Sequence, residues 1–236
     1  MPIFLNNRQP ELVEYMDRDD CDPHLLANTY KQFHIINRLL SKWRSIYMRE
    51  IRPLAKEKNA PLTLLDIGFG GGDIPLQLAK WAKQDNIALH ITAIEMDDRA
   101  MTFVEQRTIP EHVVFRICSS SDLVKENKRF DIVISNHVIH HLNNADLTSL
   151  MQDAEVLSIQ KVIFNDIERS DVGFGLFATI ASLLFWNSFI VKDGLISIRR
   201  SYTFRELRQV APPGWTVRRL FLYRLLLMWE PNVRFG

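Results

Sequence analysis

Cysteine and net charge are both scarce in this chain, and each scarcity argues against a class of protein. The two cysteines, Cys21 and Cys118, lie far apart in the sequence and make no disulfide framework. The formal net charge of +1 gives no overall electrostatic reason to expect a nucleic-acid partner. The N-terminus also lacks the basic stretch and apolar run of a secretory signal. We therefore expect a cytoplasmic protein that binds no nucleic acid.

Long uncharged runs are scarce too, but residues 172–191 have the length of a membrane-spanning helix. Polar and small residues interrupt this run, and an Asp193-Gly194 pair typical of a turn follows it. Because a spanning helix after a buried strand would disrupt the sheet described below, we expect no stable membrane insertion. The run instead predicts a buried or lid helix that lines an apolar substrate pocket.

From residue 62 onward, apolar segments of strand length alternate with amphipathic segments of helical length. Helices are predicted over 74–84, 98–107 and 145–157, and strands over 62–67, 88–95, 113–118, 130–135 and 161–165. Strands separated in this way predict a mostly parallel sheet with helices on both faces, which is a doubly wound α/β fold. Two further strands, 215–221 and 225–229, are predicted in the tail, although the turn between them lacks glycine or asparagine.

The N-terminal part has a different character. Residues 1–21 are polar and acidic, and we expect them to be loosely ordered. Asp22-Pro23 predicts a helix start, and an apolar stripe from Leu26 to Tyr47 predicts one long helix after it. We divide the chain into an N-terminal helical extension or cap, 1–58, and a compact domain, 59–236.

The central motif follows the strand predicted at 62–67. Gly68, Gly70 and Gly72 alternate in a loop before the next helix, an arrangement in which backbone N–H groups approach a nucleotide-like ligand. Acidic Asp73 occupies the place of the third glycine of dinucleotide-binding loops, and Asp66 and Asp73 would repel a pyrophosphate. The loop therefore favours a ligand with a neutral or positive centre and an amino group. Glu95, at the end of the second strand, is placed to hold a ribose hydroxyl pair.

With the segment 130–142 after the fourth strand, these motifs resemble the class I S-adenosylmethionine-dependent methyltransferases over roughly residues 60–230. The resemblance implies a Rossmann-like seven-stranded sheet that ends in an antiparallel hairpin. It also implies S-adenosylmethionine as cofactor, with Asp66 near the ammonium, Glu95 on the ribose and Met96 against the adenine. Family members often contact the adenine amino group with an aspartate where this chain has Ser119. The remaining implied cofactor contacts are Gly68, Gly70, Gly72, Ser119, Ser120 (with Asp122 as an alternative acceptor) and Asn136.

Three histidines follow the fourth strand with the spacing of one helix face: His137, His140 and His141. Histidine is the usual general base near neutral pH, and Asp166 after the fifth strand is placed to orient one ring. We expect these four residues to be catalytic, the alternative being that one histidine is structural and another solvated. The same cluster could hold a metal, but no third-ligand motif accompanies it, so the sequence predicts no metal site.

Within this family, an aromatic N-terminal helix and an insertion after the fifth strand usually build the acceptor pocket. We therefore expect Tyr30, Phe33 and His34 to contact the acceptor, with Arg200 either meeting an anionic substrate group or being solvated. The acceptor predicted is a small apolar or aromatic molecule such as a phenol, quinol or polyketide. The alternatives are a non-catalytic protein that binds S-adenosylmethionine and a nicotinamide-dependent oxidoreductase. The sequence predicts no oligomeric state.

Overall fold

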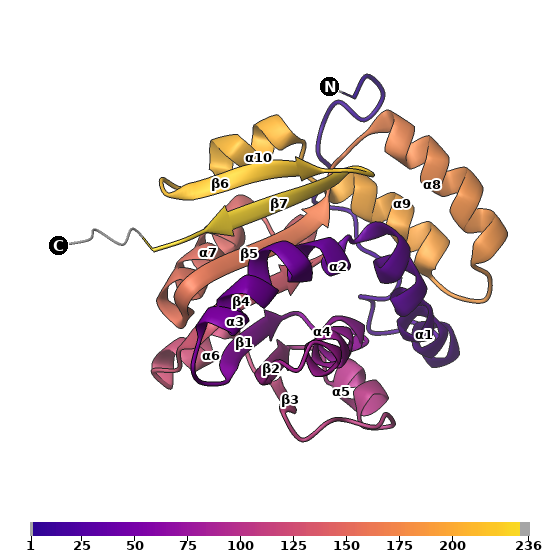
Figure 1. Cartoon of the computed structure of the whole chain (residues 1–236). Helices are drawn as coiled ribbons and strands as arrows, with labels where there is room; N and C mark the ends of the chain where they lie inside the picture. Colours follow the sequence, from indigo (N-terminus) through magenta and orange to yellow (C-terminus); the bar gives the residue numbers. More distant parts are fainter. Residues whose placement is uncertain (1, 232–236) are drawn as a thin grey trace.

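The computed structural model describes residues 2–231, which form one seven-stranded sheet flanked by helices (Figure 1). The strands are β1 (Leu62–Ile67), β2 (Leu89–Glu95), β3 (Val113–Ile117), β4 (Phe130–Asn136), β5 (Ser158–Ile167), β6 (Trp215–Leu220) and β7 (Arg224–Trp229). Their order is β3-β2-β1-β4-β5-β7-β6. The first five are parallel, and β7 runs antiparallel to β5 and β6. The predicted Rossmann-like α/β fold with its C-terminal hairpin is confirmed.

The helices cover both faces and one end of this sheet. They are α1 (Pro23–Leu40), α2 (Trp43–Ile46), the π-helix η1 (Tyr47–Ile51), α3 (Arg52–Glu57), α4 (Asp73–Gln84), α5 (Asp98–Val104), α6 (Ser120–Lys125), the 3-10 helix η2 (Ile139–His141), α7 (Asn144–Leu157), α8 (Asp171–Leu184), α9 (Ile190–Arg200) and α10 (Phe204–Val210). Figure 1 shows α1, α8 and α9 gathered at the end of the sheet toward which β5 points.

Successive residues of the central strands point to opposite faces of the sheet and pack into two different hydrophobic cores. Leu65, Val133 and Phe164 pack on one face with apolar residues of α6, α7 and α10. Leu64 and Ile132 pack on the other face with α2, η1 and α4. A parallel sheet covered on both faces needs strands that are apolar on both sides, which explains why these segments are easily recognised in the sequence.

The predicted strands and helices of the sheet region are confirmed, with boundary shifts of a few residues. Residues 62–67 form β1 as predicted, whereas the helix predicted over 98–107 ends at Val104. The hairpin of β6 and β7 turns at Leu222 and Tyr223, whose φ angles are 67° and 56°. A tight hairpin turn requires such positive φ angles, and here two large side chains adopt them in place of the usual Asn-Gly.

The single helix predicted over 172–191 is wrong. The run instead contains α8, a link, and the start of α9, and the Asp193-Gly194 pair lies inside α9 rather than in a turn. Asn187, with φ 55°, lies in the link between the two helices. Within residues 2–231, no helix is both long and apolar enough to cross a membrane.

The expectation of a loosely ordered N-terminal segment is also wrong for the described residues. Asp171 accepts hydrogen bonds from the backbone N–H groups of Ile3, Phe4 and Leu5. Arg8 donates to the carbonyl oxygens of His140 and Leu142, at 3.1 and 2.7 Å. The segment is therefore fixed against α8 and the loop that follows β4.

Substitution by alanine should change the free energy of unfolding in opposite directions at Gly175 of α8 and Gly194 of α9. A Cβ at Gly194 would lie 2.3 Å from the Phe177 ring, whereas a Cβ at Gly175 would meet nothing within 4 Å. Gly194→Ala should lower the free energy of unfolding by about 1–3 kcal/mol through overpacking. Gly175→Ala should raise it by about 0.5–1 kcal/mol, because alanine is the better helix former. Chemical denaturation measures both values, and a stabilised Gly194→Ala variant would contradict the packing of α8 on α9.

Candidate functional site

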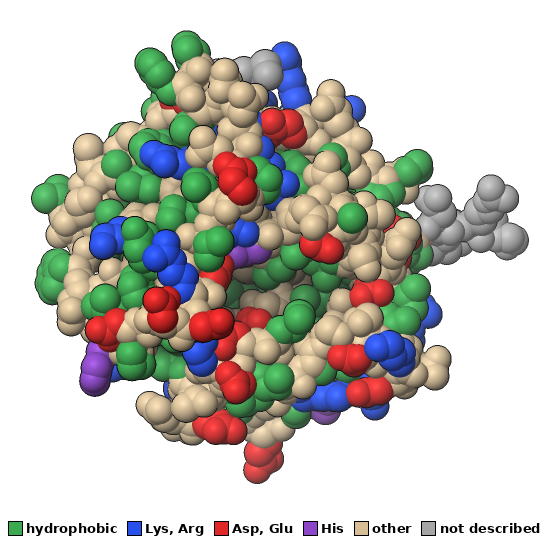
Figure 2. Space-filling model, turned by 180° about the vertical axis from the view of Figure 1, so that it is seen from behind, with side chains coloured by type: hydrophobic (Ala, Val, Ile, Leu, Met, Phe, Trp, Pro, Cys, Tyr) green, Lys and Arg blue, Asp and Glu red, His purple; other side chains and the backbone are tan. Residues whose placement is uncertain are grey.

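A cavity of about 850 Å³ lies at the carboxyl ends of the parallel strands. Its walls come from the glycine loop after β1, the ends of β2 and β4, the N-terminal segment, and α1, α8 and α9. Figure 2 looks at a face with a hollow bordered by acidic side chains and a histidine. Ligands of open α/β sheets bind at this edge, so the cavity is the candidate site.

The glycine loop joins β1 to α4 in the conformation that its sequence predicts. Gly68, Gly70 and Gly72 have φ angles of 82°, 48° and 70°. A Cβ at Gly68 would lie 2.4 Å from Val138, and one at Gly72 would lie 2.9 Å from Val104. Gly68 and Gly70 line the cavity, whereas Gly72 serves the turn into α4 and lies outside the lining.

Two buried carboxyl groups lie beside this loop. Asp66 is 1% exposed, and its Oδ1 atom has no hydrogen-bond partner. Burial, followed by repulsion from Asp73 and Glu95, raises the pKa of Asp66 well above its ordinary value. Burial also raises the pKa of Asp73, although Asn37 donates a hydrogen bond to its carboxylate at 2.9 Å. An unsatisfied acceptor in a cavity wall is suited to a ligand that donates hydrogen bonds.

Glu95 lies in the cavity wall at the end of β2, as the sequence predicts. One carboxylate oxygen accepts a hydrogen bond from the N–H of Met96 at 2.8 Å, and the other accepts one from Gly70 at 3.1 Å. Met96 is largely exposed at the rim. The carboxylate thus connects the glycine loop to the second strand.

The serines after β3 also line the cavity, but their hydroxyl groups already have partners. Ser119 caps α6 and donates to Asp122 at 2.6 Å. Ser120 donates to Asp153 at 2.7 Å. Their side chains therefore order the loop within the protein.

Asn136, at the end of β4, has its side-chain amide fixed by residues from three elements. Its carbonyl oxygen accepts hydrogen bonds from Trp43 at 2.9 Å and Arg224 at 3.2 Å. Its amide nitrogen donates to Asn37 of α1 at 3.1 Å. Sequence reasoning missed these three partners, because no local pattern connects α1 and β7 to the end of β4.

The three histidines do not share a helix face as predicted. His137 has φ 63° and precedes η2, so only His140 and His141 belong to a helical turn. Arg224 donates to the Nε2 atom of His137 at 2.8 Å. Burial, followed by repulsion from Arg224, lowers the pKa of His137 well below its ordinary value. This ring is neutral, and because Nε2 accepts a hydrogen bond, Nδ1 carries its proton.

His140 is buried between two carboxylates. Its Nδ1 atom lies 2.7 Å from Asp166, and its Nε2 atom lies 3.3 Å from Glu14. Burial alone would lower the pKa of His140, but Asp166 and Glu14 together raise it to about 9. Asp166 lies outside the cavity lining and orients the ring from the end of β5, as the sequence predicts.

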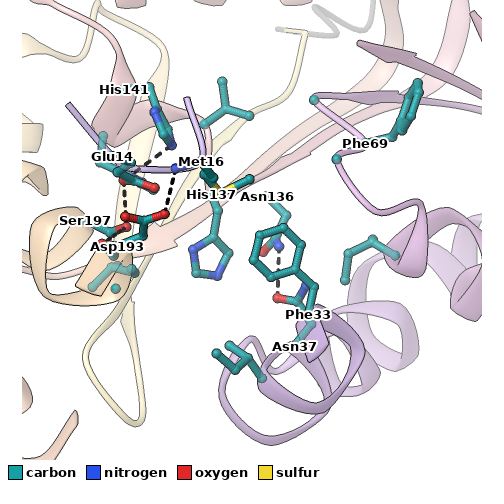
Figure 3. A pocket seen from close by; sticks show the side chains of 18 of the residues that line it. Glu14, Met16, Phe33, Asn37, Phe69, Asn136, His137, His141, Asp193 and Ser197 are labelled. Atoms are coloured by element: carbon teal, nitrogen blue, oxygen red, sulfur yellow. Dashed lines mark hydrogen bonds and ion pairs between the residues drawn. The ribbon is translucent and has the colours of Figure 1, made fainter. Parts of the chain in front are cut away.

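His141 faces the cavity with Glu14, a residue that sequence reasoning missed. The Nδ1 atom of His141 lies 3.2 Å from Asp17, and its Nε2 atom lies 3.7 Å from Glu14. Glu14 is 3% exposed and accepts a hydrogen bond from Ser197 of α9 at 2.7 Å. Figure 3 shows Glu14, His141, Asp193 and Ser197 grouped on one side of the cavity, opposite Phe33 and Asn37.

Of the four residues predicted to contact the acceptor, two line the cavity and two do not. Tyr30 and Phe33 of α1 line the cavity. His34 is exposed on α1 outside the lining, because the helix turns it away from the sheet. Arg200 is neither solvated nor part of the lining; it is buried and donates to the carbonyl oxygens of His140 and His141 at 3.3 and 3.0 Å. Arg200 therefore positions the histidine segment.

The part of the cavity beside α8 is apolar. Four side chains of α8 line it: Leu176, Phe177, Ile180 and Leu184. Ile180 and Leu184 are also 53% and 52% exposed, as is Leu39 of α1 at 53%. The apolar lining thus continues onto the outer surface between α1 and α8.

Comparisons with known proteins agree with this architecture. Residues 64–157 match the family model of a methyltransferase domain, and no curated protein sequence matches the chain. The structure of the plantazolicin methyltransferase BpumL in complex with SAH (S-adenosylhomocysteine) is similar, with a TM-score of 0.60 and 12% identity over 88% of this chain and 95% of that chain. The methyltransferase domain of bacterial CtHen1 has a TM-score of 0.53 and 18% identity, over 79% and 98% of the two chains.

The unpaired carboxyl group of Asp66 predicts a gain in stability when its charge is removed. Because its pKa is raised in the folded protein, its contribution to stability falls as pH rises above the unfolded value near 4. Asp66→Asn should therefore raise the free energy of unfolding of the ligand-free protein by about 1–3 kcal/mol at pH 8, and by less at pH 5. Denaturation at both pH values measures this, with exposed Asp98→Asn as control. A loss of stability at pH 8 would contradict the unpaired state of the carboxyl group.

Proposed function

We propose that the chain is a class I S-adenosylmethionine-dependent methyltransferase that methylates a hydroxyl oxygen of a small apolar or aromatic molecule, such as a phenol, quinol or polyketide. One observation carries the proposal: a single cavity extends from the glycine loop and Glu95 to an apolar chamber between α1 and α8. In this proposal, residues 1–58 form a cap over the site and residues 59–236 form the catalytic domain.

The end of the cavity beside the glycine loop has acceptors that suit S-adenosylmethionine. Asp66, with its unpaired Oδ1 atom, would accept hydrogen bonds from the ammonium of the methionine part. Glu95 would hold the ribose hydroxyls, and Met96 would cover the adenine. We also assign cofactor contacts to the backbone of Gly68, Gly70, Ser119, Ser120 and Asn136, with Gly72 shaping the turn.

The acceptor chamber suits an apolar molecule with one polar group. Phe33, Phe177 and Ile180 form an apolar wall, whereas Glu14 and His141 form a polar corner. An acceptor with a hydroxyl at this corner would extend its apolar part toward the exposed rim of α8. Burial of each methylene group there contributes roughly 0.8 kcal/mol to binding.

Bound S-adenosylmethionine would supply an electrophilic methyl carbon, and a lone pair of the acceptor oxygen would form the new C–O bond while the C–S bond broke and left its electron pair on sulfur. The hydroxyl proton must also leave, and the polar corner is the place for it. Nε2 of His137 accepts a hydrogen bond from Arg224, and the His140 side chain is only 2% exposed, whereas the His141 side chain is 29% exposed in the cavity wall. Of the three predicted histidines, His141 is best placed to act on the hydroxyl.

The two alternative functions are less well supported. Asp66 and Asp73 both line the cavity beside the glycine loop, where they would repel the pyrophosphate of a nicotinamide dinucleotide. A protein that only bound S-adenosylmethionine would have no use for a second, apolar chamber joined to the cofactor end.

The proposed contact of Glu95 with the ribose predicts that its removal weakens cofactor binding. Glu95→Ala should weaken S-adenosylhomocysteine binding by about 1.5–3 kcal/mol, through loss of charge-assisted hydrogen bonds to the ribose. Calorimetric titration of wild type and variant measures this, with the exposed Glu105→Ala as control and NAD titrated in parallel. Binding of NAD instead, or an unchanged affinity of Glu95→Ala, would remove the assignment.

The acceptor is tested with a series of phenols that carry alkyl chains of increasing length. For wild type, kcat/KM should rise up to about fourfold for each methylene group that becomes buried. Ile180→Ser should flatten this dependence, whereas Val172→Ser, on the same helix but outside the cavity, should not. Transfer of a labelled methyl group measures the rates. Equal rates along the series, or no transfer to any phenol, would contradict an apolar hydroxyl acceptor.

A further inference from the structure

Three side chains at the polar corner bring potential metal-ligand atoms close together. The Oε1 atom of Glu14 lies 3.3 Å from Nε2 of His140 and 3.7 Å from Nε2 of His141. Ligand atoms about 2.0–2.2 Å from a tetrahedral metal ion stand roughly 3.3–3.6 Å apart. The corner thus already has nearly the spacing of a coordinated set, and these three ligand atoms lie within 4.8 Å of one another.

His140 supplies a second, independent observation. The residue is 2% exposed, and its buried Nε2 atom has no hydrogen-bond partner. Its contact with Glu14 is close in distance but does not satisfy the nitrogen as a hydrogen bond. A metal cation bound here would take the place of the proton on Nε2 and use the lone pair that this proton occupies.

The opposite side of each ring is held as in protein metal sites. The Nδ1 atom of His140 contacts Asp166 at 2.7 Å, and the Nδ1 atom of His141 contacts Asp17 at 3.2 Å. Histidines that bind a metal through one nitrogen commonly donate the other N–H to a carboxylate, which fixes the tautomer and the ring orientation. Ser197 holds the Glu14 carboxylate in the same way, through a hydrogen bond of 2.7 Å.

The charges around the corner favour a cation. Glu14, Asp17 and Asp193 line the cavity here, and Asp166 lies behind His140. Arg200 opposes them in part, with Nη1 at 3.9 Å from Asp17, but its other donors bind the carbonyl oxygens of His140 and His141.

A neighbouring group is less suitable. His137, His140 and Asp166 also bring their atoms close together. However, Arg224 donates to His137 and adds a positive charge, and Nδ1 of His140 already binds Asp166. All three residues of the group formed by Glu14, His140 and His141 line the cavity, whereas Asp166 of the neighbouring group does not.

We propose that Glu14, His140 and His141 bind a divalent transition-metal cation, with open coordination positions directed into the acceptor chamber. Two imidazoles and one carboxylate favour zinc-like ions over magnesium or calcium. The site itself stands on the contacts above, and its role in the reaction rests on the proposed function. There the cation would coordinate the acceptor's hydroxyl oxygen and lower its pKa, so that the proton leaves to water. His141 then acts as a metal ligand and not as a base.

The test uses the untagged, chelator-treated full chain, titrated with Co²⁺ and followed by its visible absorption. Wild type should show the bands of cobalt with nitrogen and oxygen ligands, and Zn²⁺ should abolish them by displacement. His141→Ala should weaken cobalt binding at least tenfold, and Asp17→Asn should weaken it 10- to 100-fold through loss of ring orientation. His34→Ala, which removes an exposed histidine of α1, should leave binding unchanged.

Binding of S-adenosylhomocysteine, measured on the same samples, shows whether each variant is folded. Cobalt that binds wild type and His141→Ala equally, or a wild type that binds none, would overturn the metal site. If cobalt binds as expected but no phenol is methylated, the proposed acceptor fails and the site stands. If chelator-treated protein methylates a phenol at the full rate, the role of the cation in the reaction is overturned.

Discussion

The buried imidazole of His140, held between Asp166 and Glu14, joins three distant parts of the chain. Asp166 ends β5, His140 lies in the turn after β4, and Glu14 belongs to the N-terminal segment. Burial opposes a charge on Glu14, but His141 and His140 hold its pKa at about 2. These partners add to the hydrogen bonds of Arg8 and Asp171 that hold the N-terminal segment, and they fix the part of it that lines the cavity.

The two ends of the cavity are therefore stabilised differently. The cofactor end is made by β1, β2, β4 and the glycine loop, which are parts of the sheet or directly follow it. The acceptor end is made by the N-terminal segment, α1, α8 and α9, whose hydrophobic clusters contain fewer buried residues than the two cores on the sheet faces. The cluster of α1 also includes Ala93 of β2, so α1 is anchored on the sheet, whereas the cluster of α8 and the start of α9 contains no strand residue. At the cofactor end, the unpaired carboxyl group of Asp66 lowers the free energy of unfolding of the ligand-free protein, and a ligand that donates hydrogen bonds to it would remove this cost.

What the sequence predicts well is local. The segment from β1 through the glycines to α4 follows from neighbouring residues alone, and so does Glu95 at the end of β2. Glu14 was missed because only tertiary contacts bring it to His140, and its surroundings in the sequence look like a solvated end. The spacing of the three histidines predicts a shared helix face, but His137 has a left-handed backbone conformation and lies outside the helical turn. Its contact with Arg224 of β7 is tertiary and leaves no signal in the local sequence. The end of α8 and the start of α9 are hard to predict from the sequence, because an uncharged run shows no alternation of polar and apolar faces that would mark where one helix stops.

The fold also explains why the polar corner and the apolar chamber adjoin. Parallel strands end at one edge, so the loops after β4 and β5 bring His140 and Asp166 together there. The helices inserted after β5 must then return to the sheet at β6, and the α8–α9 pair does so across the same edge. α8 turns Phe177 and Ile180 toward the cavity, and α9 supplies Asp193 and Ser197 beside Glu14. One insertion thus provides both the apolar wall and the polar support, and so fixes which end of an acceptor meets the histidines.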